Sequence, residues 1–194
     1  ILPSPRYLPT DEIKADADGN PIVERRQYLL DVRLSEEEVK DRYPKVWMYL
    51  ASGKERGLCN GYICSHRSPW YSQENRPPAP ILCTYIGRGD TKRGKPFRFI
   101  LNESRATVAN VYLAMYPTPL LVRAAQKDKT LLGRIWQTLN AIGADLLLRE
   151  GRVYGGGLFK LEPKELANVD ATSIAALIPD LALKGKPTQM EMFG

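Results

Sequence analysis

The sequence predicts an α+β fold in which short antiparallel strands and loops pack with one long helix and several shorter helices. Between residues 62 and 101, apolar runs of strand length alternate with Pro, Ser and Gly breaks, which is typical of short strands joined by ordered loops. Between residues 130 and 149, apolar side chains recur at helical spacing. A chain of 194 residues is long enough for one large domain or two small ones with a packed core.

The amino-terminal third combines an extended segment with a helix. Residues 1–34 are rich in proline and turn signals, so we expect them to be extended. Ser35 followed by Glu38 matches a capping box, which predicts that a helix begins directly after Ser35. Pro44 should interrupt this helix and restart it, with the second part reaching Gly53.

The middle of the chain alternates strands with glycine-rich turns before the long helix. Residues 88–95 form a basic, glycine-rich turn, and residues 96–101 are the predicted returning strand. Another apolar stretch spans residues 108–116. The apolar spacing then predicts a single helix over residues 130–149, with Gly151 as its stop.

The last third contains a run of three glycines and two short helices. The glycines at 155–157 favour a turn between two strands. Glu162-Pro163 should start a short helix through Leu166, and residues 171–183 form a last weak helix. We therefore expect a domain over residues 35–183, a preceding extended segment and a polar tail at 184–194.

The net charge of +6 comes entirely from the middle of the chain. Residues 54–134 contain 14 Lys/Arg and 5 Asp/Glu, whereas residues 1–53 and 135–194 each carry a slight acidic excess. A local excess of positive charge is typical of a surface that faces a polyanion. Nucleic acid is therefore the leading partner class.

Cysteine content and hydropathy predict the cellular compartment of the protein. The three cysteines, an odd number, favour a reducing compartment over a disulfide framework. No apolar run approaches the roughly 18 residues that a membrane span requires, so we expect a cytoplasmic protein without a membrane partner. The chain begins at Ile1, and we expect it to be a fragment or a processed piece.

Metal-dependent chemistry is the first alternative. Cys59, Cys64, His66 and Cys83 could supply four zinc ligands, but their spacing lacks paired zinc knuckles. His66 is the only histidine, so any catalytic triad would have to use it. We therefore expect no metal site here and no catalytic residues in this chain.

A nuclease is the second alternative. Residues 162–164 match a Glu-x-Lys half-motif with Asp145 upstream, but residues 12–14 and 38–40 match equally well. A metal-dependent nuclease needs convergent carboxylates, which this pattern does not show. A basic protein-interaction domain, with the middle of the chain docking an acidic partner, remains the third possibility.

Basic and aromatic side chains carry the main functional prediction. Arginine can hold phosphates or read guanine edges, lysine mainly supplies charge, and aromatic rings can pack on sugars or displaced bases. A glycine-rich loop can approach another surface closely and can bind an anion through successive N–H groups. The predicted DNA contacts are Arg67, Tyr71, Arg76, Arg88, Lys92, Arg93, Arg98, Arg152, Tyr154, Gly155, Gly156, Gly157 and Lys160.

Three segments, in this order, resemble a known family: SPWYSQENRPPAPILCTYIGRG, PFRFILNESRATVANVYLAMYP and RVYGGGLFKLEPKEL. They are similar to the C-terminal target-recognition region of bacterial adenine-specific (N6) DNA methyltransferases of restriction–modification systems. The opening SPRYLP also resembles the segment where the catalytic domain of such enzymes ends. The resemblance extends from the start of the chain to about Leu166.

The resemblance implies that this chain recognises DNA and that a separate domain carries out catalysis. The family carries an S-adenosylmethionine-binding domain and an Asn-Pro-Pro-Tyr motif, and neither occurs in these 194 residues. We therefore expect no cofactor in this chain, S-adenosylmethionine in the catalytic domain of the parent chain, and residues 1–34 as the linker to that domain. The implied function is sequence-specific binding of double-stranded DNA, while the parent enzyme flips and methylates an adenine.

Overall fold

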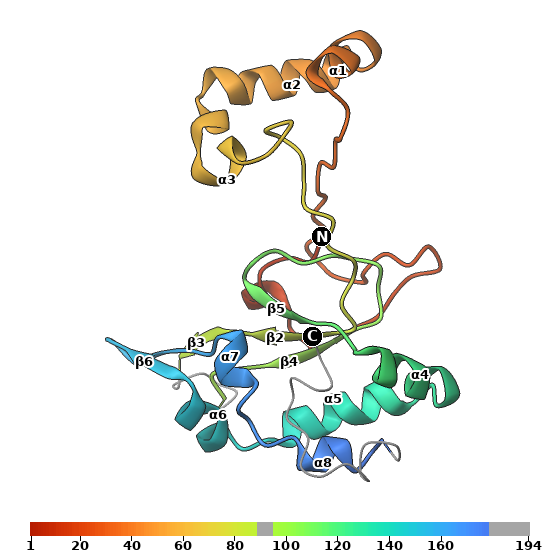
Figure 1. Ribbon diagram of the computed structural model, residues 1–194, viewed down its shortest axis with the longest axis vertical. Helices are drawn as coiled ribbons and strands as arrows, with labels where there is room; N and C mark the ends of the chain where they lie inside the picture. Colours follow the sequence, from red (N-terminus) through yellow and green to blue (C-terminus); the bar gives the residue numbers. More distant parts are fainter. Residues whose placement is uncertain (89–94, 179–194) are drawn as a thin grey trace. The chain divides into compact units, whose positions relative to one another are not determined.

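The computed structural model describes residues 1–88 and 95–178, and its chain divides into two compact units (Figure 1). The first unit comprises Ile1–Gln27 together with the chain from Pro77 onward, and the second comprises Tyr28–Arg76. The second unit is thus inserted into the sequence of the first. The sequence suggested domain boundaries at residues 34 and 183; position 183 and the expected tail at 184–194 lie outside the described residues.

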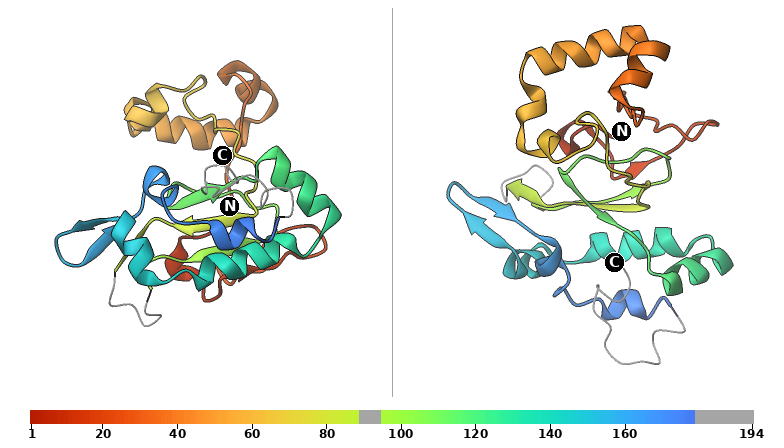
Figure 2. Two further views of the ribbon diagram at one scale, coloured as in Figure 1. Left: turned by 60° about the horizontal axis from the view of Figure 1, so that its bottom comes forward. Right: turned by 45° about the horizontal axis from the view of Figure 1, so that its top comes forward.

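The first unit holds two sheets and most of the helices (Figures 1 and 2). Its strands are β1 (Glu12–Ile13), β2 (Ile81–Thr84), β3 (Ile86–Arg88), β4 (Phe99–Asn102), β5 (Tyr112–Met115), β6 (Arg152–Tyr154) and β7 (Leu158–Lys160). Its helices are the 3-10 turn η1 (Pro5–Tyr7), α4 (Pro119–Lys127), α5 (Leu131–Ala141), α6 (Ala144–Glu150), α7 (Pro163–Leu166) and α8 (Thr172–Ala175). None of the described helices combines the length and apolarity that a membrane crossing needs.

The larger sheet has the strand order β1-β4-β2-β5. β2 pairs antiparallel with both β4 and β5, and the short β1 adds to β4 in parallel. Cys83 lies opposite Phe99 on β4 and opposite Leu113 on β5. The predicted antiparallel strands and the α+β class are confirmed.

Both faces of this sheet are covered because alternate residues of a strand point to opposite sides. Ile81 and Cys83 of β2 join the core cluster that includes residues of α4, α5 and α6, whereas Leu82 joins a second cluster. All three side chains are fully buried. The larger sheet is therefore an internal scaffold.

The amino-terminal segment supplies the cover for the second face. Leu2, Leu8 and Ile13 are buried in that second cluster, and β1 extends the sheet itself. Residues 1–27 are therefore part of the packed fold, whereas the sequence suggested a linker over residues 1–34. The apolar residues responsible are too widely spaced among prolines to form a recognisable period.

The predicted single helix over residues 130–149 is wrong, because the structure breaks it into α5 and α6. Ile142 and Gly143 have extended backbone angles, and glycine is a weak helix former. Lys95 caps the end of α5 by donating from Nζ to the carbonyls of Asn140 and Ile142, at 2.5 and 3.3 Å. α6 then ends before Gly151, as predicted.

The second unit is a small helical insert. It contains α1 (Glu36–Arg42), α2 (Pro44–Glu55), the 3-10 turn η2 (Leu58–Asn60) and α3 (Tyr62–Ser65). The capping box is confirmed: Glu38 N–H donates to Ser35 Oγ, and Ser35 N–H donates to Glu38 Oε2. The sequence predicted strands from Tyr62 onward, but residues 62–65 form α3 instead. The apolar run is too short for its spacing to distinguish a helix from a strand.

Candidate nucleic-acid interface

The smaller sheet brings together four of the predicted DNA contacts from segments far apart in the sequence. Its strand order is β3-β7-β6, and both pairings are antiparallel. Arg88 and Tyr154 both pair with Leu158, while Arg152 pairs with Lys160. Directly paired residues, and residues two apart along a strand, share one face of a sheet. Arg88, Arg152, Tyr154 and Lys160 therefore lie on one face, which we call the basic face.

The other face of the smaller sheet is only partly covered, because Val153 on this face is 67% exposed. Phe159 packs against the main core cluster. A Cβ added to Gly87 would lie 1.7 Å from the carbonyl oxygen of Pro96, so only glycine permits this close approach. β6 forms the outer edge, and the β6–β7 hairpin extends away from the body of the unit (Figure 2).

The side chains of the basic face are accessible to different degrees. The Arg152 side chain is 60% exposed and that of Lys160 is 28% exposed. Arg88 and Tyr154 are exposed as well. Within residues 1–88 and 95–178, no ion pair is found for Arg88. Ile86, which the sequence analysis did not select, shares this face and is exposed.

Carboxylates near the start of α7 hold two of these cations. Arg152 Nε donates to Glu165 Oε1 at 2.5 Å, and Lys160 Nζ lies 2.6 Å from Glu162 Oε1. These contacts raise the pKa of Arg152 and of Lys160, chiefly through the bonds to Glu165 and Glu162 respectively. The bond from Lys160 also lowers the pKa of the Glu162 carboxyl. Arg152, Lys160 and Glu162 are therefore charged near neutral pH.

The three glycines form the tip of the β6–β7 hairpin, which confirms the predicted turn between two strands. Gly156 and Gly157 have φ of +76° and +70°, a region that side chains with a Cβ rarely adopt. Gly155 has no such angle, and a Cβ added to any of the three would meet nothing within 4 Å. The tip is therefore narrow and open on its sides.

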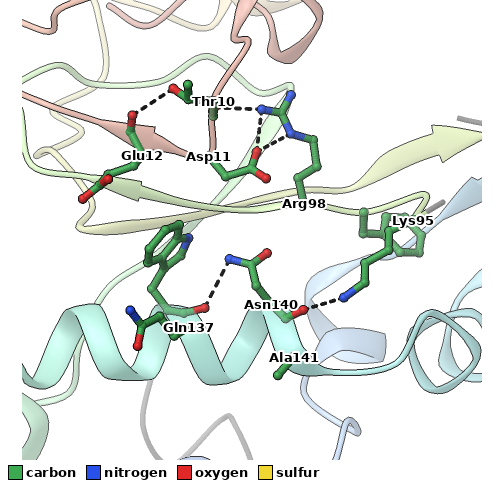
Figure 3. Close-up of a pocket in the computed structure, with 10 residues that line it drawn as sticks. Thr10, Asp11, Glu12, Lys95, Arg98, Gln137, Asn140 and Ala141 are labelled. Carbon is green, nitrogen blue, oxygen red and sulfur yellow. Dashed lines mark hydrogen bonds and ion pairs between the residues drawn. The ribbon is translucent and has the colours of Figure 1, made fainter. Parts of the chain in front are cut away.

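Arg98 differs from its predicted role because its side chain is used within the fold. Its Nε lies 2.6 Å from Asp11 Oδ1, and a terminal nitrogen donates to the carbonyl of Thr10 at 2.9 Å (Figure 3). Its terminal nitrogens also donate to the carbonyls of Pro5 and Leu8 at 2.9 Å. The side chain is only 14% exposed. We therefore leave Arg98 out of the proposed interface.

Arg98 also lines a groove of about 630 Å³ beside α5 (Figure 3). Most of its polar wall is engaged in the fold: Lys95 binds backbone carbonyls of α5 and its end, and Asn140 Nδ2 donates to the carbonyl oxygens of Phe99 and Trp136. Gln137 also lines the groove. A groove whose polar groups already hold the backbone is better suited to a structural role than to ligand binding.

Three further predicted contacts belong to the inserted helical unit. Tyr71 is 6% exposed, and its hydroxyl donates to the carbonyl of Leu34 at 2.7 Å, so it is a core residue there. Arg67 donates to Ser72 O and is mostly covered, whereas Arg76 is half exposed and pairs with Glu74. We leave Tyr71 and Arg67 out of the proposed interface. Lys92 and Arg93 lie outside the described residues.

The residues weighed for metal chemistry are dispersed. In the described part of the chain, no group of three or more His, Cys, Asp and Glu side chains is arranged to hold a metal ion. Cys83 is buried in β2, and burial raises the pKa of its thiol. Cys59 and Cys64 belong to the other unit. Glu162 is engaged by Lys160.

Sequence reasoning considered Glu162 only as part of a half-motif and a helix start, and it missed the contacts of Glu162 and Glu165 with the basic face. Glu162 and Glu165 stand three residues apart at a helix start, which is the spacing of an amino-terminal capping pair. Glu162 N–H donates to Glu165 Oε2 at 2.8 Å. That spacing could have predicted the capping role of Glu165. Its contact with Arg152 could not be predicted in this way, because it depends on the position of the β6–β7 hairpin relative to α7.

Comparison with known proteins places this chain in a family. Residues 13–187 match the family model described as the C-terminal domain of the Type II methyltransferase M.Eco57I. The chain is 30% identical over 138 residues to the Type II methyltransferase M.XamI of Xanthomonas campestris pv. amaranthicola. It is 28% identical over 144 residues to the Type II methyltransferase M.AccI of Acinetobacter calcoaceticus.

These matches cover most of this chain but only part of each relative. They include 71% and 74% of this chain, and 23% and 24% of M.XamI and M.AccI respectively. The chain thus spans about a quarter of the length of these relatives. No solved structure matches it. The chain belongs to the family of Type II methyltransferase C-terminal domains, which confirms the predicted resemblance to the C-terminal region of a restriction–modification methyltransferase.

Proposed function

We propose that this member of the family is the target-recognition domain of a DNA methyltransferase and binds double-stranded DNA sequence-specifically through the basic face. The observation that carries the proposal is the convergence of Arg88, Arg152, Tyr154 and Lys160 on one exposed face of the β3-β7-β6 sheet. Family membership supplies the methyltransferase context.

The shape of the β6–β7 hairpin suits duplex DNA. The major groove admits a two-stranded β-ribbon, and this hairpin extends from its unit with a tip made only of glycine (Figure 2). A tip without side chains can come close to the floor of a groove or to a phosphate. Behind it, Arg88 and Arg152 offer guanidinium groups that can bind phosphate or guanine.

Within the proposal, catalysis belongs to another domain of the parent chain. Among the described strands, only β1 and β4 are paired in parallel, so these sheets do not fit the largely parallel nucleotide-binding fold. We therefore assign S-adenosylmethionine to a catalytic domain outside these residues. The acceptor in this proposal is the amino group of an adenine in DNA.

The direct test is selection from randomised duplex DNA by the purified chain over a series of salt concentrations. Sequence-specific recognition predicts an enriched motif and affinity that falls as salt rises, because phosphate contacts release counterions. Equal binding to heparin and to every duplex sequence would instead support a basic protein-interaction domain. Absence of duplex binding at low salt would contradict the proposal.

A pair of matched variants tests the assignment to the basic face. Replacing Arg88 and Arg152 by Gln should weaken duplex binding and make the slope of log K against log salt shallower by about 2, if both side chains bind phosphates. The control replaces Arg123 and Lys127, exposed on α4 of the same unit, by Gln. Equal losses for the two double variants would show that only the net charge matters.

A further inference from the structure

The basic face is not simply positive, because fixed carboxylates stand beside two of its cations. Arg152 is held by Glu165, and Lys160 is held by Glu162. Arg152 Nη2 also lies 3.7 Å from Glu162 Oε2. Arg88, on the same face, has no ion-pair partner among the described residues. The cations of one face thus differ in how readily they can accept a new anion.

The fold holds Glu165 in place. One oxygen of its carboxylate accepts the N–H of Glu162 at 2.8 Å, and the other accepts Arg152 Nε at 2.5 Å. The Glu165 side chain is 13% exposed, in contrast to 60% for Arg152. A carboxylate fixed by the backbone cannot turn away when another anion approaches Arg152.

We propose that Glu162 and Glu165 are specificity-determining residues that lower the affinity of Arg152 and Lys160 for DNA phosphates irrespective of sequence. This inference rests on the proposed DNA-binding function. A phosphate that approaches either cation must compete for donors already in use and meets a negative charge next to them. A matching base edge recovers energy through hydrogen bonds that depend on sequence. The carboxylates therefore widen the difference between specific and non-specific binding.

The test removes the two charges while preserving the shape of the side chains. In the Glu162→Gln/Glu165→Gln variant, the amide oxygen at position 165 can still accept the helix-start N–H. We expect affinity for a randomised 20-base-pair duplex to rise about three- to tenfold at low salt, because exposed ion pairs are individually weak. The salt slope should become steeper by about 1 to 2.

A matched control separates local competition from net charge. Glu12 and Glu103 both pair with Lys14, on a different part of the same unit. The Glu12→Gln/Glu103→Gln variant therefore changes the net charge equally without touching the basic face. We expect its affinity for the randomised duplex to stay close to that of the parent chain.

Two contrary results are distinguishable. If the parent chain binds the duplex and the two double variants have the same affinity for it as each other, the inference is overturned while the proposed function stands. If neither the parent chain nor either variant binds the duplex at low salt, both the inference and the proposed function are overturned. Circular dichroism of each variant, together with the single Glu162→Gln change, checks that altered binding does not come from loss of the fold.

Discussion

The two sheets of the first unit are built from similar short strands but are solvated differently. In the β1-β4-β2-β5 sheet, β2 and β4 are buried at every position, because helices cover one face and the amino-terminal segment covers the other. In the β3-β7-β6 sheet, every residue of β6 is exposed. Polar side chains in the first sheet are consequently used to hold the chain together, whereas those of β6 in the second sheet lie at the surface.

Two arginines make this difference concrete. Arg98 and Arg152 each form a close ion pair with a carboxylate. Arg98 also satisfies three backbone carbonyls at 14% side-chain exposure, whereas Arg152 is 60% exposed. Basic residues of equal charge can therefore belong to a scaffold or to a surface. The following predictions test that separation.

The largest expected contrast is between apolar residues of the two sheets. Phe99 of β4 is 1% exposed, whereas Val153 of β6 is 67% exposed. Phe99→Ala should lower the free energy of unfolding by about 3–5 kcal/mol through lost burial and a cavity. Val153→Ala should change it by less than about 0.5 kcal/mol. Urea unfolding followed by circular dichroism measures both, and a similar loss in the two variants would remove the distinction between the sheets.

Replacing the two arginines should also destabilise the protein unequally, with a smaller difference in unfolding free energy than between Phe99→Ala and Val153→Ala. Arg98→Met keeps the aliphatic stem but removes the guanidinium that donates to Asp11 and to three backbone carbonyls, so we expect a loss of about 2–4 kcal/mol in unfolding free energy. Arg152→Met should cost no more than about 1 kcal/mol, since exposed ion pairs contribute little. The same urea titrations apply, and an Arg98→Met protein as stable as the parent would refute the scaffold role.

The hairpin tip allows a comparison within three consecutive residues. Gly156 has φ of +76°, and Gly155 has no positive φ. Alanine at 156 should destabilise the protein by about 1–2 kcal/mol because of backbone strain. Alanine at 155 should be within about 0.5 kcal/mol of the parent. Thermal unfolding compares the two, and equal midpoints would argue against the turn geometry described above.

The smallest expected effect is a titration at Glu162. Its carboxyl pKa is lowered from the ordinary value of 4.5, chiefly by the bond from Lys160. Because the folded pKa is lower than the unfolded one, the stabilisation is complete above about pH 4.5 and is lost as pH falls through the folded value. Carboxyl NMR should show this lowered midpoint in the parent and a rise toward 4.5 in Lys160→Gln. An unchanged midpoint would contradict the ion pair.

Local features of the sequence were sufficient to predict several elements. The Ser35–Glu38 capping box, the restart of a helix at Pro44 and the short helix that begins at Pro163 are all confirmed. Each depends on contacts between residues a few positions apart. The long helix failed at Ile142, where Lys95 binds carbonyls 45 and 47 residues further along the chain, so no local pattern contained the reason.

The sequence by itself determined the α+β class, the basic middle of the chain and the glycine turn, because composition, periodicity and backbone propensity are local properties. Tertiary structure alone decided which basic residues are available. Arg98 meets Asp11 across 87 residues, and Arg88 joins Arg152 and Lys160 only because β3 pairs with β7. Pairing over such distances depends on tertiary contacts, such as the close approach of Gly87 to Pro96 and the packing of Phe159 against the main core cluster, which no single segment of the sequence reveals.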